Sequence, residues 1–214
     1  MITVKFSQSI ISGGMAELAG IFGELKRIIE KGGTVVYPTD TLYALGASAY
    51  DERAVALVYK IKKRPAGAPI SIAIHSVSEI GNYAVMTRQA RLIAQKCLPG
   101  PVTLVLKNRG RLKAIRGDKI GIRVPGNPIA LELARVCGPL TATSANMHGG
   151  KAPVTLRAAQ EQLGGNVDVY IDAGKCGHMK GSTVIDLTGK SPKILREGAV
   201  PLKNLEECIN AARR

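Results

Sequence analysis

The feature that most constrains the fold of this 214-residue chain is a regular alternation of strand-like and helical segments from about residue 33 to the C-terminus. This alternation is typical of an α/β protein rather than of separate helical and strand domains. No internal repeat or long linker interrupts it. We therefore predict an α/β fold with a single domain over residues 1–214.

The expected strands cover residues 34–37, 70–74, 102–106, 120–124, 140–143, 167–171, 183–187 and 193–195. Helices are expected at about residues 51–64, 88–97, 128–137, 155–163 and 202–212, with one more across the sheet near residues 18–28. Asp51 and Asn127 precede two of these helices and are expected to cap them, because a short polar side chain can accept hydrogen bonds from the first free amides. Pro65 and Gly138 are expected to end the same two helices.

The location of the protein is predicted from its apolar runs and its cysteines. The apolar runs are shorter than the roughly 18 residues of a membrane span, and no basic stretch with a long apolar segment opens the chain, so we expect neither a span nor a signal peptide. Four scattered cysteines favour the reducing cytoplasm. Cys176 and His178 have no second ligand pair, so no protein-bound metal is expected.

Thirty Lys and Arg residues against sixteen Asp and Glu give a formal net charge of +14, which favours nucleotides or RNA as partners. A solvated basic surface is the alternative interpretation. The chain has 4% aromatic residues and no Trp, which argues against a base-stacking platform. The densest basic stretch, which supports a double-stranded RNA or tRNA-binding module, contains Lys107, Arg109, Arg111, Lys113, Arg116 and Lys119.

The familiar phosphate-binding loop is missing from the sequence. Lys175 and Lys190 each follow a Gly, but Val169 and Val184 occupy the positions where the first Gly of that loop belongs. If ATP binds, it must therefore be held by side chains collected from several strand ends, where ligands of open α/β sheets usually lie.

Lys62 and Arg64 stand at the end of a predicted helix and can project toward a common point, where they could hold phosphates. Favourable placement of cations at a helix C-terminus explains them equally well without a ligand. Thr39, Ser144 and Asn146 follow predicted strands, where they could contact a ligand or satisfy amides of their own loops.

Two arginines and a serine extend this set of candidates. Arg123 lies inside an apolar strand, so it requires a carboxylate ligand, an internal acid or an exposed edge. Ser182 and Arg196 also stand at strand ends, and Arg196 could instead form a surface salt bridge. The three histidines have no Ser/Asp or Cys/Asn arrangement on the same face, so we expect no catalytic triad.

Seven segments, in order along the chain, resemble the YrdC-like family of threonylcarbamoyl-AMP synthases. They are GTVVYPTDTLY at 33–43, KKRP at 62–65, PGPVTL at 99–104, GIRVP at 121–125, TSAN at 143–146, GSTVID at 181–186 and ILREG at 194–198. The chain is most similar to the short members of the family, which lack an extra C-terminal domain. Two departures are Ala44, where Gly is common, and a histidine, His75, outside the usual register.

The resemblance implies a twisted mixed sheet flanked by helices, with a large concave cleft. It implies the condensation of L-threonine, bicarbonate and ATP, with Mg²⁺ held mainly by phosphates, and a product passed to the complex that makes threonylcarbamoyl-adenosine in tRNA. By position, it assigns ATP binding to Lys62, Arg64, Ser144, Asn146 and Arg196, with Lys62 and Arg64 in the catalytic role. It assigns threonine binding to Thr39, Arg123, Thr143 and Ser182.

Two other functions compete with this one. A carbamoyl transferase of the hydrogenase-maturation type also makes a carbamoyl adenylate, but such proteins are much longer and carry paired cysteine motifs. An RNA-binding module would need only the basic surface, and its binding would depend on salt but not on ATP or threonine.

Overall fold

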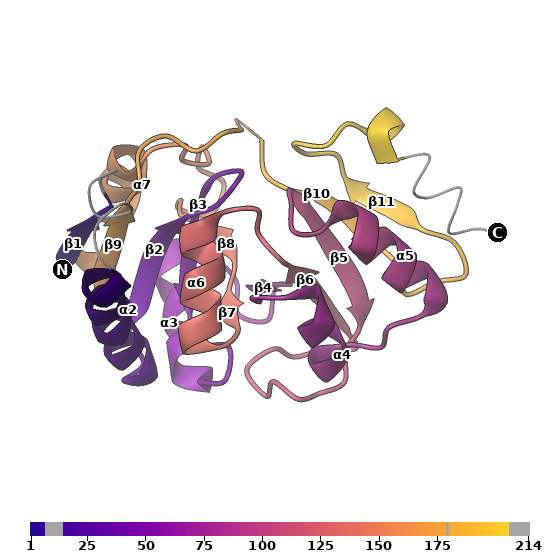
Figure 1. Cartoon of the computed structure of the whole chain (residues 1–214), viewed down its shortest axis with the longest axis horizontal. Helices are drawn as coiled ribbons and strands as arrows, with labels where there is room; N and C mark the ends of the chain where they lie inside the picture. The colour runs from indigo at the N-terminus through magenta and orange to yellow at the C-terminus, as the bar shows by residue number, and fades with distance from the viewer. Residues whose placement is uncertain (7–14, 179, 206–214) are drawn as a thin grey trace.

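The computed structural model describes residues 1–6, 15–178 and 180–205, and its strands form two mixed sheets that lie side by side (Figure 1). The first sheet has the order β1 (Ile2–Lys5), β9 (Val169–Asp172), β2 (Thr34–Pro38), β3 (Tyr43–Ala47) and β8 (Thr143–Ser144). The second has the order β11 (Lys193–Arg196), β10 (Thr183–Asp186), β5 (Val102–Lys107), β6 (Lys119–Arg123), β4 (Ser71–Ala73) and β7 (Leu140–Thr141).

Helices cover both faces of the first sheet. Helices α2 (Met15–Glu30) and α6 (Pro128–Cys137) pack on the face that carries Val35 and Tyr37 of β2. Helices α3 (Glu52–Lys62) and α7 (Leu156–Leu163) pack on the opposite face, to which Val36 points. Because β2 is buried on both faces, it is apolar throughout instead of alternating.

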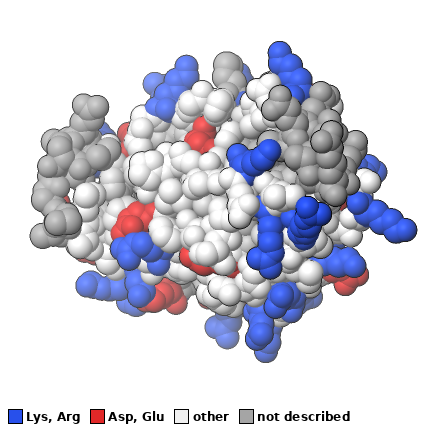
Figure 2. Space-filling model, turned by 45° about the vertical axis from the view of Figure 1, so that its right-hand side comes forward, with Lys and Arg blue, Asp and Glu red and all other residues white. Residues whose placement is uncertain are grey.

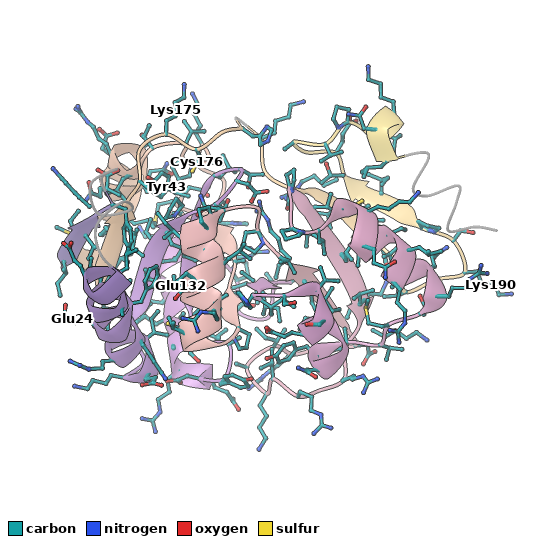
Figure 3. The ribbon with its side chains drawn as sticks, in the orientation of Figure 1. Glu24, Tyr43, Glu132, Lys175, Cys176 and Lys190 are labelled. Carbon is teal, nitrogen blue, oxygen red and sulfur yellow. The ribbon has the colours of Figure 1, made fainter. Side chains whose placement is uncertain are left out.

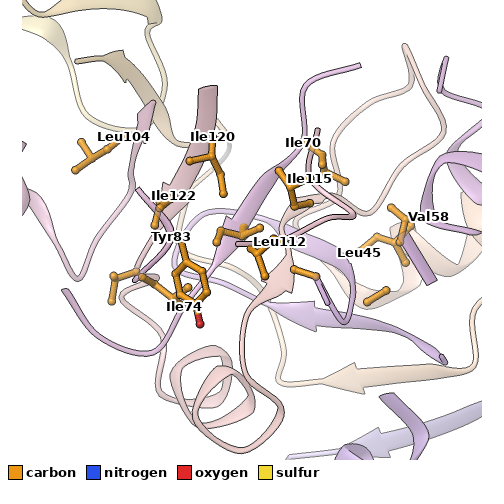
Figure 4. Packing of buried hydrophobic residues seen from close by; sticks show 14 of the residues in the cluster. Leu45, Val58, Ile70, Ile74, Tyr83, Leu104, Leu112, Ile115, Ile120 and Ile122 are labelled. Atoms are coloured by element: carbon orange, nitrogen blue, oxygen red, sulfur yellow. The ribbon is translucent and has the colours of Figure 1, made fainter. Parts of the chain in front are cut away.

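The larger core joins the α3 face of the first sheet to the second sheet. Figure 4 shows Leu45 and Val58 at one end of this core and Leu104 and Ile122 at the other. Helices α4 (Ile80–Tyr83) and α5 (Arg88–Cys97) complete it on the side of the second sheet, where α5 packs on β5. The two sheets therefore share one continuous hydrophobic core.

The segment 140–144 crosses from one sheet to the other. Its first part, β7, pairs with β4 in the second sheet, and after Ala142 its second part, β8, pairs with β3 in the first sheet. The sequence predicts one strand here and one mixed sheet, whereas the structure has two short strands and two sheets. The α/β class and the mixed pairing are confirmed, but strand order within a sheet depends on long-range contacts that local patterns do not encode.

The predicted helix boundaries next to the site are confirmed. Asp51 Oδ1 accepts hydrogen bonds from the amides of Arg53 and Ala54 at 2.8 and 3.2 Å and caps α3. The helix ends at Lys63, whose left-handed backbone (φ 50°) turns the chain before Pro65. This turn sets the direction in which Arg64 leaves the helix, whereas Lys62 is still the last residue of α3.

The sequence interpretation missed β1, β3 and α4. Strand β3 has the sequence YALGA, in which alanine and glycine give little strand preference, and its pairing with β2 and β8 determines its conformation. Of the helix expected at 202–212, residues 202–205 are helical, while the remainder and Cys208 lie outside the described residues. Within the described part of the chain, no helix has both the length and the apolar character needed to cross a membrane.

Candidate functional site

A cleft of about 440 Å³ opens where the two sheets meet. Residues from β3 and β8 of the first sheet line it together with residues from β5, β6, β10 and β11 of the second. The lining includes every predicted site residue except Lys62 and Asn146: Thr39, Arg64, Arg123, Thr143, Ser144, Ser182 and Arg196. The cleft thus collects side chains from segments that are up to 157 residues apart, counted from Thr39 to Arg196.

One wall of the cleft follows the end of α3, and we call it the helix-end wall: Arg64, Thr143 and Ser144, with Lys62 and Asn146 behind them. Arg64 Nη2 donates to the carbonyl of Pro69 at 2.6 Å, and its Nη1 lies 3.5 Å from Thr143 Oγ1. Arg64 Nε is buried and has no hydrogen-bond partner among the described residues. Since no described acid pairs with Arg64, its charge remains available to an anion in the cleft.

Lys62 is 3% exposed and holds the loop that follows β8. Its ammonium donates to the carbonyl oxygens of Ser144 and, at 2.7 Å, of Asn146. Burial, together with the nearby Arg64 charge, lowers the pKa of Lys62 to about 8. The structure therefore places Lys62 behind Ser144, where it fixes the loop, instead of projecting beyond the helix as its spacing from Arg64 predicts.

Asn146 acts inside the same loop. Its amide nitrogen donates to the carbonyls of Met147 and Gly150 at 2.8 and 2.7 Å. Its side-chain oxygen is buried without a partner among the described residues. This residue stabilises the turn behind Ser144 and leaves one acceptor unused.

The opposite wall belongs to the second sheet, and we call it the sheet wall: Thr103, Arg123, Ser182 and Arg196. Arg123 Nη2 forms an ion pair with Asp40 Oδ1, and both side chains are about nine-tenths buried. Of the three partners that sequence reasoning left open for Arg123, the structure selects an internal acid. Asp40 Oδ2 and Arg123 Nε have no partner among the described residues, so the pair retains unused hydrogen-bonding capacity.

Arg196 and Ser182 are joined on the sheet wall. Arg196 Nη2 donates to the Ser182 carbonyl at 2.8 Å and to Ser182 Oγ at 3.3 Å, and its Nε reaches the same carbonyl at 3.2 Å. Burial and the Arg123 charge lower the pKa of Arg196. Two guanidinium groups thus share this wall, and an anion bound between them would relieve their repulsion.

Thr39 closes a tight turn at one edge of the cleft. Its hydroxyl donates to the carbonyl of Leu42 at 2.7 Å and accepts from the amides of Thr41 and Leu42 at 3.2 Å each. These bonds correspond to the turn-capping alternative of the sequence analysis. The same residue lines the cleft, so the capping role does not remove it from the site.

Several polar residues at or beside the cleft were not predicted as site residues, among them Asp40, Thr103 and Lys180. Asp40 belongs to the TDT segment, Thr103 to the PGPVTL segment, and Lys180 precedes the GSTVID segment. Thr103 and Lys180 line the cleft, and Asp40 pairs with Arg123. All three lie inside or next to segments that resemble the family, which could have identified them. Their residue types alone did not distinguish them from ordinary turn or strand residues.

Cys176 is a buried thiol, and Figure 3 shows it above the cleft residue Tyr43 on the segment after β9. Burial raises the pKa of Cys176 to about 11, with a further upward contribution from Asp40. The thiol is therefore protonated near neutral pH and is a poor nucleophile. His75 lies outside the cleft lining, with its Nδ1 3.1 Å from the Leu131 carbonyl.

Comparison with known proteins places this cleft in context. A profile of the Sua5/YciO/YrdC family, described as "Telomere recombination", matches residues 27–198. A Methanocaldococcus jannaschii protein provisionally named a threonylcarbamoyl-AMP synthase is 41% identical over 185 residues, which cover 86% of this chain and 88% of that protein. A Pyrococcus abyssi protein named threonylcarbamoyl-AMP synthase is 37% identical over 86% of this chain and 56% of its own length.

A solved structure resembles the whole fold. P. abyssi Sua5 complexed with L-threonine has a TM-score of 0.86 and 33% sequence identity, and the match covers 97% of this chain and 60% of that one. This chain therefore spans a little over half the length of the P. abyssi proteins that it matches.

Proposed function

Because the chain belongs to the Sua5/YciO/YrdC family, we propose that it is a threonylcarbamoyl-AMP synthase, which converts L-threonine, bicarbonate and ATP into threonylcarbamoyl-AMP and pyrophosphate. The observation that carries the proposal is the content of the cleft. Its lining contains four cations, Arg64, Arg123, Lys180 and Arg196, and one acid, Glu197. Such a site suits substrates that bring several negative charges together.

The helix-end wall is proposed to bind the phosphates of ATP. Arg64 offers a guanidinium without an ion-pair partner among the described residues, and Ser144 offers a hydroxyl beside it. Lys62 and Asn146 hold the loop that presents Ser144. Arg196 is proposed to complete the nucleotide contacts from the sheet wall.

The sheet wall is proposed to bind threonine. Arg123 is held in one orientation by Asp40 and has further N–H groups to donate to an amino-acid carboxylate. Ser182 adds a hydroxyl on the same wall, while Thr39 and Thr143 are proposed to complete the pocket. The L-threonine complex of P. abyssi Sua5 supports a threonine site in this fold.

The chemistry follows from bringing these substrates together. The threonine amine combines with bicarbonate, water leaves, and an N-carboxylate forms. One of its oxygens attacks the α-phosphorus of ATP, and the bond from that phosphorus to the bridging oxygen breaks to release pyrophosphate. The attacking oxygen is already anionic, so the protein supplies alignment and charge neutralisation and needs no nucleophile of its own.

We propose that Mg²⁺ accompanies ATP and is held by phosphate oxygens and water, the ligands that this ion prefers. The described residues contain no cluster of three or more His, Cys, Asp or Glu that could hold a metal. When bound, Mg²⁺ would neutralise charge on the phosphates. Glu197 lines the cleft, and Asp40 beside it is already paired with Arg123.

The product is proposed to reach the cytoplasmic complex that completes threonylcarbamoyl-adenosine in tRNA. A direct RNA contact is a secondary proposal, supported by the net charge of +14 and by the Lys and Arg side chains that Figure 2 shows on one face of the molecule. Within the basic stretch 107–119, Arg116 pairs with Glu52 and Lys119 with Asp186. The other four, Lys107, Arg109, Arg111 and Lys113, form no ion pair with described residues and are the candidates for phosphate contacts.

The decisive experiment measures pyrophosphate release by the purified protein, with threonine and bicarbonate omitted in turn. We expect release only when ATP, threonine and bicarbonate are all present. Release that continues without threonine would contradict the proposed function, as would binding of RNA with no pyrophosphate release under any condition.

A further inference from the structure

Thr103 contributes to the sheet wall a buried hydroxyl that none of the proposed substrate contacts uses. Its side chain is 4% exposed and lines the cleft. Strands β5 and β10 run parallel with Val102 opposite Thr183, and this register brings Ser182, the residue before β10, within reach of Thr103. The two hydroxyl oxygens are 2.7 Å apart, which is a hydrogen-bond distance.

The hydrogen bonds around this pair leave one hydrogen unused. Two hydroxyls carry two hydrogens, and only one of them can lie between the two oxygens. Arg196 can only donate, and its Nη2 lies 3.3 Å from Ser182 Oγ, so the Ser182 oxygen already accepts one bond. If Thr103 donates the second bond to that oxygen, both acceptor positions of Ser182 Oγ are filled and the Ser182 hydrogen is free.

The free hydrogen of the Ser182 hydroxyl can point into the cleft. Ser182 is 6% exposed and lines the cavity. Within the described part of the chain, neither Thr103 nor Ser182 offers its hydroxyl hydrogen to another acceptor. A buried donor of this kind is expected to find an acceptor, and a bound anion can provide one.

We propose that Thr103 is a positioning residue: by donating to Ser182, it fixes the Ser182 hydroxyl as a donor toward a carboxylate oxygen of the amino-acid substrate. The inference rests on the proposed function, which places the amino acid on this wall. In this arrangement, Thr103 donates to Ser182, and Ser182 donates to the substrate. Arg196 donates a second hydrogen bond to Ser182 Oγ. Without Thr103, the Ser182 hydrogen can turn toward other acceptors and is no longer committed to the ligand.

The test compares Thr103→Val, which keeps the branched shape and removes the hydroxyl, with Thr103→Ser, which keeps the hydroxyl. Steady-state pyrophosphate release is measured with threonine and ATP varied separately. For Thr103→Val we expect the KM for threonine to rise about 10-fold, as for the loss of one well-placed hydrogen bond, and the KM for ATP to change less than about 2-fold. Thr103→Ser is expected to restore most of the threonine KM.

Thr141→Val is the matched control. Thr141 is a fully buried strand residue whose Oγ1 accepts a hydrogen bond from the Ala47 amide at 3.1 Å, and it does not line the cleft. Its substitution is expected to lower the melting temperature without separating the KM for threonine from the KM for ATP. An equal change in both KM values for Thr103→Val would show a general structural role and overturn the inference.

A double-mutant cycle keeps the inference testable if Thr103→Val is destabilised. Calorimetric binding of threonine at a temperature where all variants are folded is compared in the Ser182 and Ser182→Ala backgrounds. We expect Thr103→Val to weaken binding with Ser182 present and to have no further effect in Ser182→Ala, because the same hydrogen bond is already lost. Additive effects would overturn the inference.

Measurements on the wild-type protein distinguish a failure of the proposed function from a failure of the role proposed for Thr103. If it shows no threonine-dependent pyrophosphate release, the proposed function fails, and the inferred acceptor fails with it. If the wild type is active and Thr103→Val leaves the KM for threonine unchanged, only the role of Thr103 is overturned.

Discussion

The two walls of the cleft hold their cations in different ways. On the helix-end wall, Lys62 and Arg64 donate to neutral carbonyl oxygens, so their positive charges are not neutralised by the protein. On the sheet wall, Arg123 is paired with the carboxylate of Asp40. Arg196 on the sheet wall also donates to a carbonyl, that of Ser182, so the difference lies in Arg123. It indicates that the helix-end wall attracts highly charged phosphates, whereas Asp40 orients the guanidinium of Arg123 for one small anion.

Removing Arg123 should have the largest effect, because it removes one partner of the buried ion pair on the sheet wall. Arg123→Ala leaves Asp40 buried without its partner, so we expect a loss of about 3 kcal/mol in the free energy of unfolding. We also expect the threonine requirement to weaken far more than ATP binding. Urea unfolding and calorimetric titration with each substrate would measure the two effects.

The exposed ion pair between Arg157 and Glu161 provides a control for that experiment. Arg157→Ala should leave stability and both affinities nearly unchanged, because solvent screens the pair. Wild-type threonine affinity in a folded Arg123→Ala protein would contradict the assignment of the sheet wall to threonine.

Removing Arg64 tests the opposite wall and should have a smaller effect on stability. Arg64 is only partly buried and pairs with no described acid, so Arg64→Ala should stay folded. We expect kcat/KM for ATP to fall about 30-fold, as for one lost hydrogen-bonded charge, with threonine binding little changed. Lys60→Ala, on an exposed position of α3, is the matched control, and equal losses in both variants would indicate a non-specific charge effect.

The smallest expected effect is a pH dependence that distinguishes Lys62 from the arginines. The pKa of Lys62 is lowered to about 8, so its ammonium loses its proton as the pH rises through that value. The bonds to the Ser144 and Asn146 carbonyls then lose their charge, and we expect ATP affinity to fall by a few-fold between about pH 7.5 and 9. Calorimetry over this range would measure the change.

Lys62→Arg distinguishes the titration of Lys62 from that of other groups in the protein, because arginine keeps its charge throughout this pH range. Its ATP affinity should be constant between about pH 7.5 and 9. A fall of the same size in Lys62→Arg would assign the pH dependence to another group.

Local signals in the sequence predicted most helices and strands, but they did not predict how the strands pair to form two sheets. Asp51, Asn127 and Gly138 identified helix ends, because capping depends on neighbouring residues alone. The strand break at Ala142 and the strand YALGA depend on partners that are distant in sequence, so no local pattern revealed them.

The candidate site shows the same limit. Of the four cations that the sequence selected, Arg64, Arg123 and Arg196 line the cleft, and Lys62 does not. The sequence did not identify Asp40 as the partner of Arg123, because the two residues are 83 positions apart in the sequence. It also did not reveal that Lys62 faces the loop behind Ser144, because the carbonyl partners of Lys62 lie 82 and 84 positions away in the sequence.

The crossing segment 140–144 also limits how the gene can change. Residues 140–141 are in register with β4 and residues 143–144 with β3, with a single residue between the two pairings. One inserted or deleted codon at this point would shift a register and turn side chains from the cleft toward the core in one of the sheets. Substitutions can therefore accumulate in this segment more readily than changes in its length.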